Sequence, residues 1–396
     1  MKYGCKRMIA LLLCLAMMLS LPIVTFAEQD GTELTEDELA ALDSAMEGDE
    51  AADTSAEEAE LQALEDAMAD MPDDEIDPSD LELNADLPGN VINIALFGLD
   101  NRVAKKSDMA TDVNERELEL AAGRSDAVII CSLNLDTGDI KLTSIARDVM
   151  VTIPGYKDDR RVNVAFYYGG KKYKDKADQV THGATLAMRT LNRNFKMNIQ
   201  KYVVVNIYGL SNIIDALGGV DLDMTKAEAK RINFELKKEP MDKVERTPVA
   251  AQDGVQHLDG MQAVTFARIR GLDNDNERTS RQRKLLEALL EQVLNGMDLA
   301  RFTELIQTAL PYGATNLTAA ELVQYGSCVL SGQAMQNLSS GSGIFEQMRI
   351  PICKGDVVNG QTYEKNMYGF KNSMTYIKKD YFALTVDELH KFIYGE

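Results

Sequence analysis

Residues 91–102 read VINIALFGLDNR, and the fold class follows from this stretch. Its first part, Val91–Phe97, is a short apolar run, which is typical of a strand buried on both faces. Gly98 then allows a sharp exit, and Asp100 and Arg102 follow. Because ligands bind beyond the carboxyl ends of strands in open α/β sheets, Asp100 is predicted to lie at a ligand-binding edge. The alternative is an ordinary turn with a surface ion pair.

Beyond this stretch, apolar runs and helical segments alternate along the chain. Ala127–Leu135, a turn at 136–139 and Ile140–Ile145 predict a hairpin. Further strands are predicted at Tyr202–Ile207, Val220–Met224, Val264–Ile269 and Met348–Ile352. Helices are predicted over Thr185–Phe195, Leu210–Leu217, Lys284–Leu294 and within 299–332. The pattern predicts an α/β fold with a single three-layer domain, in which a central mixed β-sheet is flanked by helices.

The charge of the chain is concentrated in one segment. The 396 residues carry a net charge of −21, but residues 28–88 hold 24 Asp and Glu and no Lys or Arg, and residues 89–396 are neutral. An acidic low-complexity linker is therefore predicted over 28–88. A folded domain is predicted over 89–396, with Pro88 and Gly89 at the boundary. The chain shows no recognisable nucleic-acid-binding element, so no nucleic-acid partner is expected.

The first 27 residues have the form of a targeting segment. Basic residues end at Arg7, Met8–Val24 is apolar apart from Ser20, and Ala27 offers a small residue for cleavage. The apolar run of about 17 residues is at the lower limit for a membrane span. Residues 1–27 are thus either a signal peptide or an N-terminal membrane anchor. Both interpretations place the body outside the cytoplasm, because the positive flank precedes the apolar run.

The number and spacing of the cysteines and histidines argue against several kinds of site. The body holds only Cys131, Cys328 and Cys353, with no CxxC spacing, so neither a disulfide framework nor a zinc motif is indicated. A single Cys328–Cys353 bridge stays open. The three histidines are scattered, which argues against a His-rich metal site and a Ser-His-Asp triad.

Asp126 precedes the second strand, and Arg147 follows the third. Two carboxylates such as Asp100 and Asp126 can share a site only if a cation lies between them. Magnesium fits this arrangement, because it takes one or two protein carboxylates together with phosphate oxygens and water. Arg147 is expected at the same edge if the strand order permits, with Asn163 shortly after it in the chain. Asp126 can approach Asp100 only if residues 103–123 fold back, and the alternative for Asp126 is a solvated turn.

Arginines are bunched between 268 and 283. On the strand predicted there, Arg268 and Arg270 would point to one face. On the following helix, Arg278, Arg281 and Gln282 would share one side, near a helix N-terminus that favours anions. Planar guanidinium groups suit diphosphate. The alternative is a surface helix with salt bridges to the neighbouring Asp and Glu.

Several segments in this order carry a resemblance to a known family. They are NIALFGLDNR (93–102), GRSDAVIICSLNLDTGDIKLTSIARD (123–148), RVNVAFYYGG (161–170), YVVVNIYGLSNIIDALGGVDLDM (202–224), LDGMQAVTFARIR (258–270) and RTSRQRKLLEALL (278–290). Together they resemble the LytR-CpsA-Psr (LCP) family of cell-envelope proteins over about Val91–Leu294.

The resemblance implies roles for individual residues. Asp100 and Asp126 would hold Mg²⁺, or Mn²⁺ in its place. The pyrophosphate would be held by Arg147, Arg268, Arg270, Arg278 and Gln282. Asp275 would act in catalysis with Arg268 and Arg270, by assisting the acceptor hydroxyl. The segment after Arg270 is shorter than the family pattern, so Asp273 competes for that role. Asp108 or Asp112, in a long charged loop, could replace a metal ligand.

The resemblance also implies a function. Family members are extracytoplasmic phosphotransferases that move a glycopolymer from a polyprenyl pyrophosphate carrier to a cell-wall acceptor, usually peptidoglycan, at the membrane surface. The alternative is a non-catalytic envelope scaffold or sensor that binds polyprenyl lipid or glycopolymer. Catalysis needs the metal carboxylates, whereas a binder needs only the arginines and an apolar groove. A hydrolase that releases the glycan to water is a third alternative.

Overall fold

A computed structural model gives the fold. It describes residues 81–99, 123–238, 245–269, 313–332, 345–371 and 374–395, and single helical positions at 281, 284, 285, 288, 289 and 292. The predicted targeting segment, most of the acidic linker and the loop after Asp100 lie outside these residues. Within the described part of the chain, no helix has the length and apolar character needed to cross a bilayer.

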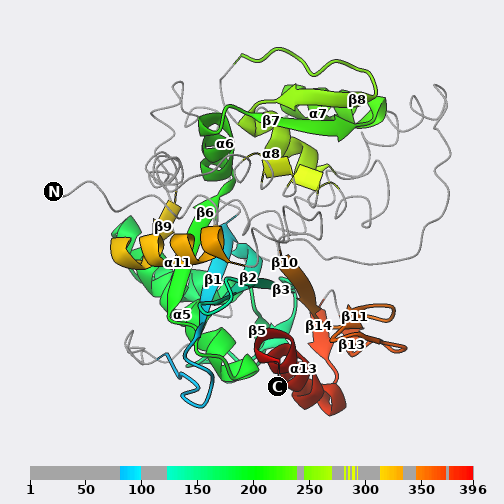
Figure 1. Ribbon diagram of the computed structural model, residues 1–396. Helices are drawn as coiled ribbons and strands as arrows, with labels where there is room; N and C mark the ends of the chain where they lie inside the picture. The colour runs from blue at the N-terminus through cyan, green and yellow to red at the C-terminus, as the bar shows by residue number, and fades with distance from the viewer. Residues whose placement is uncertain are drawn as a thin grey trace.

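A six-stranded mixed sheet forms the centre of the molecule (Figure 1), with the strand order β10-β3-β2-β1-β6-β9. Its strands are β1 (Val91–Leu99), β2 (Ser125–Asn134), β3 (Ile140–Ile145), β6 (Lys201–Asn206), β9 (Gly313–Thr315) and β10 (Phe345–Ile350). β1 is antiparallel to β2 and parallel to β6, while β3 is antiparallel to β2 and parallel to β10. The predicted mixed sheet and the β2–β3 hairpin are confirmed.

Helices cover both faces of this sheet. They are α4 (Val164–Gly170), α5 (Lys176–Phe195), α6 (Ile207–Ala216), α7 (Lys226–Lys238), α8 (Gly260–Arg268), α11 (Ala319–Ser331) and α13 (Lys379–Tyr394). In Figure 1, α6 and α8 lie on one side of the sheet, and α5 and α13 lie on the other. The three-layer prediction is therefore confirmed.

Alternation along β1 explains why two cores form. Ile94 and Leu96 point into the core that includes residues of α6, α8 and α11, whereas Ala95 and Phe97 point into the core that includes residues of α4, α5 and α13. Successive side chains of a strand face opposite ways, so a continuous apolar run fills both cores. This is the physical basis of the pattern that predicts a doubly covered strand.

Smaller two-stranded sheets flank the centre. They are β4 (Met150–Val151) with β5 (Arg160–Arg161), β7 (Val220–Met224) with β8 (Gly254–Leu258), β11 (Val357–Val358) with β12 (Gln361–Thr362), and β13 (Tyr368–Lys371) with β14 (Met374–Ile377). The last two pairs lie between the central strand β10 and helix α13 in the sequence.

The turn between β2 and β3 shows how tightly α11 packs. Gly138 has a φ of +72°, and a Cβ placed there would lie 2.6 Å from the carbonyl oxygen of Cys328. Only glycine fits such a left-handed position at this approach distance. Cys328 is a free thiol, as are Cys131 and Cys353, so the structure contains no Cys328–Cys353 bridge.

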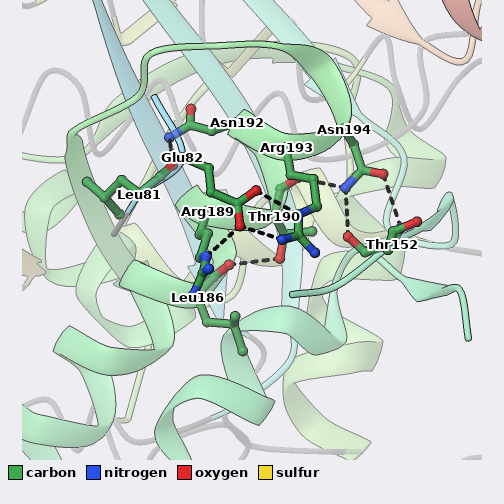
Figure 2. A network of polar contacts seen from close by, with 9 residues as sticks. All are labelled: Leu81, Glu82, Thr152, Leu186, Arg189, Thr190, Asn192, Arg193 and Asn194. Atoms are coloured by element: carbon green, nitrogen blue, oxygen red, sulfur yellow. Dashed lines mark hydrogen bonds and ion pairs between the residues drawn. The ribbon is translucent and has the colours of Figure 1, made fainter. Parts of the chain in front are cut away.

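The segment before the predicted domain boundary packs on the domain (Figure 2). The Glu82 carboxylate accepts hydrogen bonds from Arg189 Nε at 2.9 Å and from Arg193 Nε at 2.6 Å, and Asn192 donates to the carbonyl oxygen of Leu81 at 2.8 Å. The contacts of Glu82 reach over more than 100 residues of sequence. The end of the acidic stretch is thereby held on α5.

The strand prediction at Val264–Ile269 is wrong, because these residues belong to α8 and its C-terminus. Asp259 caps the helix: its carboxylate accepts from the Gln262 backbone, and the Gln262 side chain accepts from the Asp259 backbone. This capping box is visible in the sequence as Asp-x-x-Gln before an apolar run. The β-branched and aromatic residues suggested a strand, but the cap and the packing against α6 and α7 favour a helix.

Candidate functional site

The carboxyl end of β1 is the edge at which the site is built. Leu99, its last residue, pairs with Ser125 at the start of β2 and with Asn206 at the end of β6. Asp126 follows Ser125 directly, and Asn206 caps α6 by accepting from the Gly209 backbone at 2.8 Å. Polar groups therefore gather where three strands meet, as the strand order predicts.

Asp126 and Arg147 are brought together at this edge. Arg147 Nη1 lies 3.2 Å from Asp126 Oδ2, and the side chains are 45% and 28% exposed. Arg147 follows the end of β3, whose last residue Ile145 pairs with Val128 of β2. The antiparallel register of β2 and β3 thus sets the ion pair, and both groups remain open to a ligand.

Asn163 links the segments around this pair. Its side-chain amide donates to Asp126 Oδ1 at 3.4 Å, and its backbone accepts from Ser125 N at 3.0 Å and donates to the carbonyl oxygen of Arg147 at 3.3 Å. Asn163 Oδ1 is buried with no hydrogen-bond partner in the structure. A buried amide oxygen without a partner is costly, so a donor or a cation at this point would stabilise it.

Aromatic and basic side chains border the edge. Tyr156 and Tyr168 stack with ring centroids 4.6 Å apart. Burial raises the pKa of both phenols, and the nearby positive charge of Arg160 lowers it by a smaller amount. Arg124 also acts on Tyr168. The two rings therefore stay neutral, and the guanidinium groups of Arg160 and Arg124 nearby are suited to anionic ligands.

Comparison with known proteins establishes the family. The model of the LytR_cpsA_psr family matches residues 52–368. The chain belongs to this family. The match includes every element that forms the edge described above, and it confirms the resemblance stated from the sequence motifs.

Relatives within the LytR_cpsA_psr family are distant. The chain is 25% identical over 308 residues to the polyisoprenyl-teichoic acid–peptidoglycan teichoic acid transferase TagV of Bacillus subtilis, covering 77% of this chain and 70% of that protein. It is 30% identical over 213 residues to the TagU enzyme of Oceanobacillus iheyensis, covering 52% and 58%. The crystal structure of gbs0355 from Streptococcus agalactiae superposes with a TM-score of 0.50 at 18% identity, over 77% of this chain and 88% of that one. The last likeness concerns the fold.

The donor atoms at the LytR_cpsA_psr edge suit a hard cation. Asp126 offers a carboxylate, and Asn163 Oδ1 is a buried oxygen without a partner. Magnesium and manganese prefer such oxygen ligands. Among the described residues there is no cluster of three or more His, Cys, Asp or Glu. Asp100, Asp108 and Asp112 lie outside the described residues, so Asp126 is the described carboxylate of the predicted metal pair.

Arg268 belongs to the arginines bunched between 268 and 283, and it lies within the described residues. It is partly exposed. It lies in the last turn of α8 and not on a strand, so the strand face predicted to be shared by Arg268 and Arg270 is wrong. The remaining predicted site residues lie outside the described residues: Arg270, Asp273, Asp275, Arg278 and Gln282.

Arg281 does not join the anion-binding side of its helix. Its side chain is 2% exposed, Nη1 lies 3.3 Å from Glu228 Oε1, and Nη2 donates to the carbonyl oxygen of Ile269 at 3.3 Å. Near the start of α7, the Glu228 carboxylate accepts a hydrogen bond from the backbone N–H of Thr225 at 2.9 Å. Arg281 is thus a buried structural partner of α7, and its expected place in the arginine cluster is corrected.

Sequence reasoning missed two parts of the site. Asn163 is in a recognised motif, yet its bridging position depends on β2 and on Arg147, which only the folded chain brings to it. Tyr156 and Tyr168 carried no functional signal in the sequence. The sequence shows only that they lie on either side of the basic strand β5.

Proposed function

We propose that this chain is an extracytoplasmic phosphotransferase that moves a glycopolymer from a polyprenyl pyrophosphate carrier onto a cell-wall acceptor, with peptidoglycan as that acceptor. The observation that carries the proposal is the Asp126–Arg147 pair, bridged by Asn163, at the sheet edge of a LytR_cpsA_psr domain. The names of two relatives, polyisoprenyl-teichoic acid–peptidoglycan teichoic acid transferases from Bacillus subtilis and Enterococcus faecalis, support it.

The reaction proposed is a displacement at phosphorus. An acceptor hydroxyl oxygen forms a bond to the sugar-bearing phosphorus. The bond from that phosphorus to the bridging oxygen of the pyrophosphate breaks, and polyprenyl phosphate leaves with that oxygen and its electron pair. The hydroxyl proton passes to a base, the role proposed for Asp275. No oxidant or reductant is needed.

The arginines act on the charge that develops during this displacement. Arg147 is already oriented by Asp126 and partly exposed, so it can contact a phosphoryl oxygen without a change of fold. Arg268, Arg270, Arg278 and Gln282 are proposed to hold the rest of the pyrophosphate. Donors that are oriented before the reaction stabilise a transition state more than mobile ones do.

We further propose that Asp126 and Asp100 hold Mg²⁺ or Mn²⁺. When bound, such an ion would neutralise phosphate charge and polarise the phosphoryl group. The backbone of Asn163 is fixed by its hydrogen bonds with Ser125 and Arg147, and its side-chain amide contacts the Asp126 carboxylate. The chain itself therefore orients the carboxylate through the amide of Asn163.

The test uses the full-length protein in detergent with a polyprenyl pyrophosphate-linked oligosaccharide and a peptidoglycan fragment, with magnesium or with a chelator. Product masses are read directly. Magnesium-dependent glycan phosphate on the acceptor, lost in Asp126→Asn and Arg147→Ala, is expected. The matched control is Asp221→Asn, which removes an exposed carboxylate paired with His257 on β8.

Two outcomes would overturn the transferase proposal, and a third would overturn the role of Asp126. Donor binding without turnover on any acceptor, together with full binding by Asp126→Asn, would identify a scaffold or sensor. Glycan phosphate released to water at the same rate with and without acceptor would identify a hydrolase. Transfer that persists in Asp126→Asn would remove the carboxylate from the mechanism.

A further inference from the structure

The β13–β14 hairpin carries an aromatic side chain that the fold leaves in water. Phe370 is 71% exposed, more than the other exposed large apolar residues of the described chain. Its ring lies edge-on to Tyr368, with centroids 5.1 Å apart. In Figure 1 this hairpin stands at the outer edge of the molecule, beyond β10. The exposed ring of Phe370 is therefore available to an apolar partner.

Lysines outnumber exposed carboxylates in the segment around Phe370. Between residues 353 and 380 the exposed carboxylates are Glu364 and Asp380, whereas Asp356 is buried in an ion pair with Arg349. Five lysines are exposed in the same segment: Lys354, Lys365, Lys371, Lys378 and Lys379. The segment is therefore cationic at its surface, whereas residues 89–396 as a whole are neutral. Such a surface is complementary to an anionic partner.

The hairpin is attached to Asp148, the residue that follows Arg147 in the chain. The Thr375 backbone donates to the carbonyl oxygen of Asp148 at 3.0 Å, and the Thr375 hydroxyl donates to the Asp148 carboxylate at 2.6 Å. Thr375 is 3% exposed and pairs with Phe370 across the hairpin. Asp148 is the neighbour of Arg147. The position of Phe370 is thus coupled to the site edge through two hydrogen bonds.

We propose that the β13–β14 hairpin rests in the headgroup region of an anionic bilayer, with Phe370 inserted at the interface and the neighbouring lysines on lipid phosphates. The inference rests on the proposed function, in which the donor is held in the membrane by its polyprenyl chain. An aromatic side chain flanked by lysines binds such an interface through apolar burial and through the negative surface potential. The hairpin sets the height of Arg147 above the membrane.

The absence of tryptophan from the sequence makes a direct test practicable. The full-length protein is reconstituted into vesicles of phosphatidylglycerol and phosphatidylcholine, with part of the phosphatidylcholine brominated as a quencher. Phe370→Trp is expected to lose most of its emission in brominated vesicles. The matched control is Val255→Trp on β8, which replaces an apolar residue that is 69% exposed far from the hairpin in Figure 1, and it is expected to keep its emission. Equal emission of the two variants would overturn the proposal.

A second set of variants and conditions tests whether the membrane contact requires the lysines and anionic lipid. Adding Lys371→Glu and Lys379→Glu to Phe370→Trp is expected to reduce the quenching, as are raised salt and vesicles without phosphatidylglycerol. Adding Lys226→Glu and Lys230→Glu, which reverse two exposed lysines of α7, is expected to leave it unchanged. If the quenching stays the same under all of these changes, anionic lipid is not required and that part of the proposal is overturned. A blue shift that depends on protein concentration without lipid would instead assign the hairpin to a second copy of the chain.

The quenching experiment contains no glycan donor and no acceptor, so it is independent of catalysis. Quenching of Phe370→Trp in a chain that transfers no glycan would leave the membrane contact standing and remove the proposed function. Glycan transfer from a donor held in vesicles, without quenching of Phe370→Trp, would leave the proposed function standing and remove the membrane contact. Where both hold, Phe370→Ser is expected to slow transfer in vesicles but not in detergent, whereas Val255→Ser slows neither.

Discussion

Arg147 Nη1 lies 3.2 Å from Asp126 Oδ2, across the register of two neighbouring strands at the carboxyl edge of β1. Asp126→Asn is expected to reduce glycan transfer by at least about 100-fold, because an oriented charge acts on the transition state. The pair is partly exposed, so its loss should change the free energy of unfolding by less than about 1 kcal/mol. That corresponds to a melting temperature within about 4 °C of the parent. Transfer rates and calorimetry measure the two effects, and a strongly destabilised but active variant would contradict the assignment.

Arg268→Ala is expected to abolish transfer while leaving the melting temperature nearly unchanged. Arg268 lies in the last turn of α8 and is partly exposed, so its truncation is expected to leave the buried core intact. The same assays measure both quantities, and Arg268→Lys separates the need for a fork-shaped donor from the need for charge. A large loss of stability with transfer retained would make Arg268 a structural residue.

Arg281→Ala is expected to lower the free energy of unfolding by about 3–5 kcal/mol, because it leaves Glu228 buried without its cation. Denaturant unfolding monitored by circular dichroism gives the change. Glu228→Gln and the double variant complete a mutant cycle, in which the double loss is expected to be smaller than the sum of the single losses. Strict additivity would show that the two side chains do not interact.

Glu82→Gln tests the hold of the N-terminal segment on α5 through its pH dependence. The hydrogen bond from Arg193 lowers the pKa of Glu82, with Arg189 adding to the effect and burial opposing it. A carboxyl with a lowered pKa in the folded state stabilises the fold above its unfolded pKa, and this contribution is lost as pH falls through the folded pKa. The stability difference between parent and Glu82→Gln is therefore expected to be full at neutral pH and to shrink below about pH 4.5. Thermal unfolding between about pH 3 and about pH 7 covers the carboxyl titration and measures it. A difference that grows in acid would contradict the ion pair.

Local patterns predict the central strands well. Val91–Phe97, Ala127–Leu135 and Ile140–Ile145 are apolar over the length of a strand, and each lies within two residues of its observed bounds. The hairpin and the ligand edge follow from chain direction and from the turn at 136–139. These local features are sufficient to predict that Asp126 and Arg147 share one edge of the sheet.

Residues 260–268 show where local patterns mislead. Their β-branched and aromatic content favours a strand, but the Asp259–Gln262 capping box and burial among α6 and α7 make them a helix. Arg281 is a second example. Its helical spacing suits an anion site, yet its partner Glu228 lies 53 residues away and draws it into the core.

Residues that are near one another in the chain were enough to indicate the family, the alternation of strands and helices, and the edge at which Asp126 and Arg147 lie. Four further features required the folded chain: the burial of Arg281, the hold of α5 on Glu82, the bridge that Asn163 makes between Asp126 and Arg147, and the tie from Thr375 to Asp148. Each of these depends on a partner that packing brings from a distant part of the sequence. Burial makes an unpaired polar group costly, and which group is buried is decided by the whole fold.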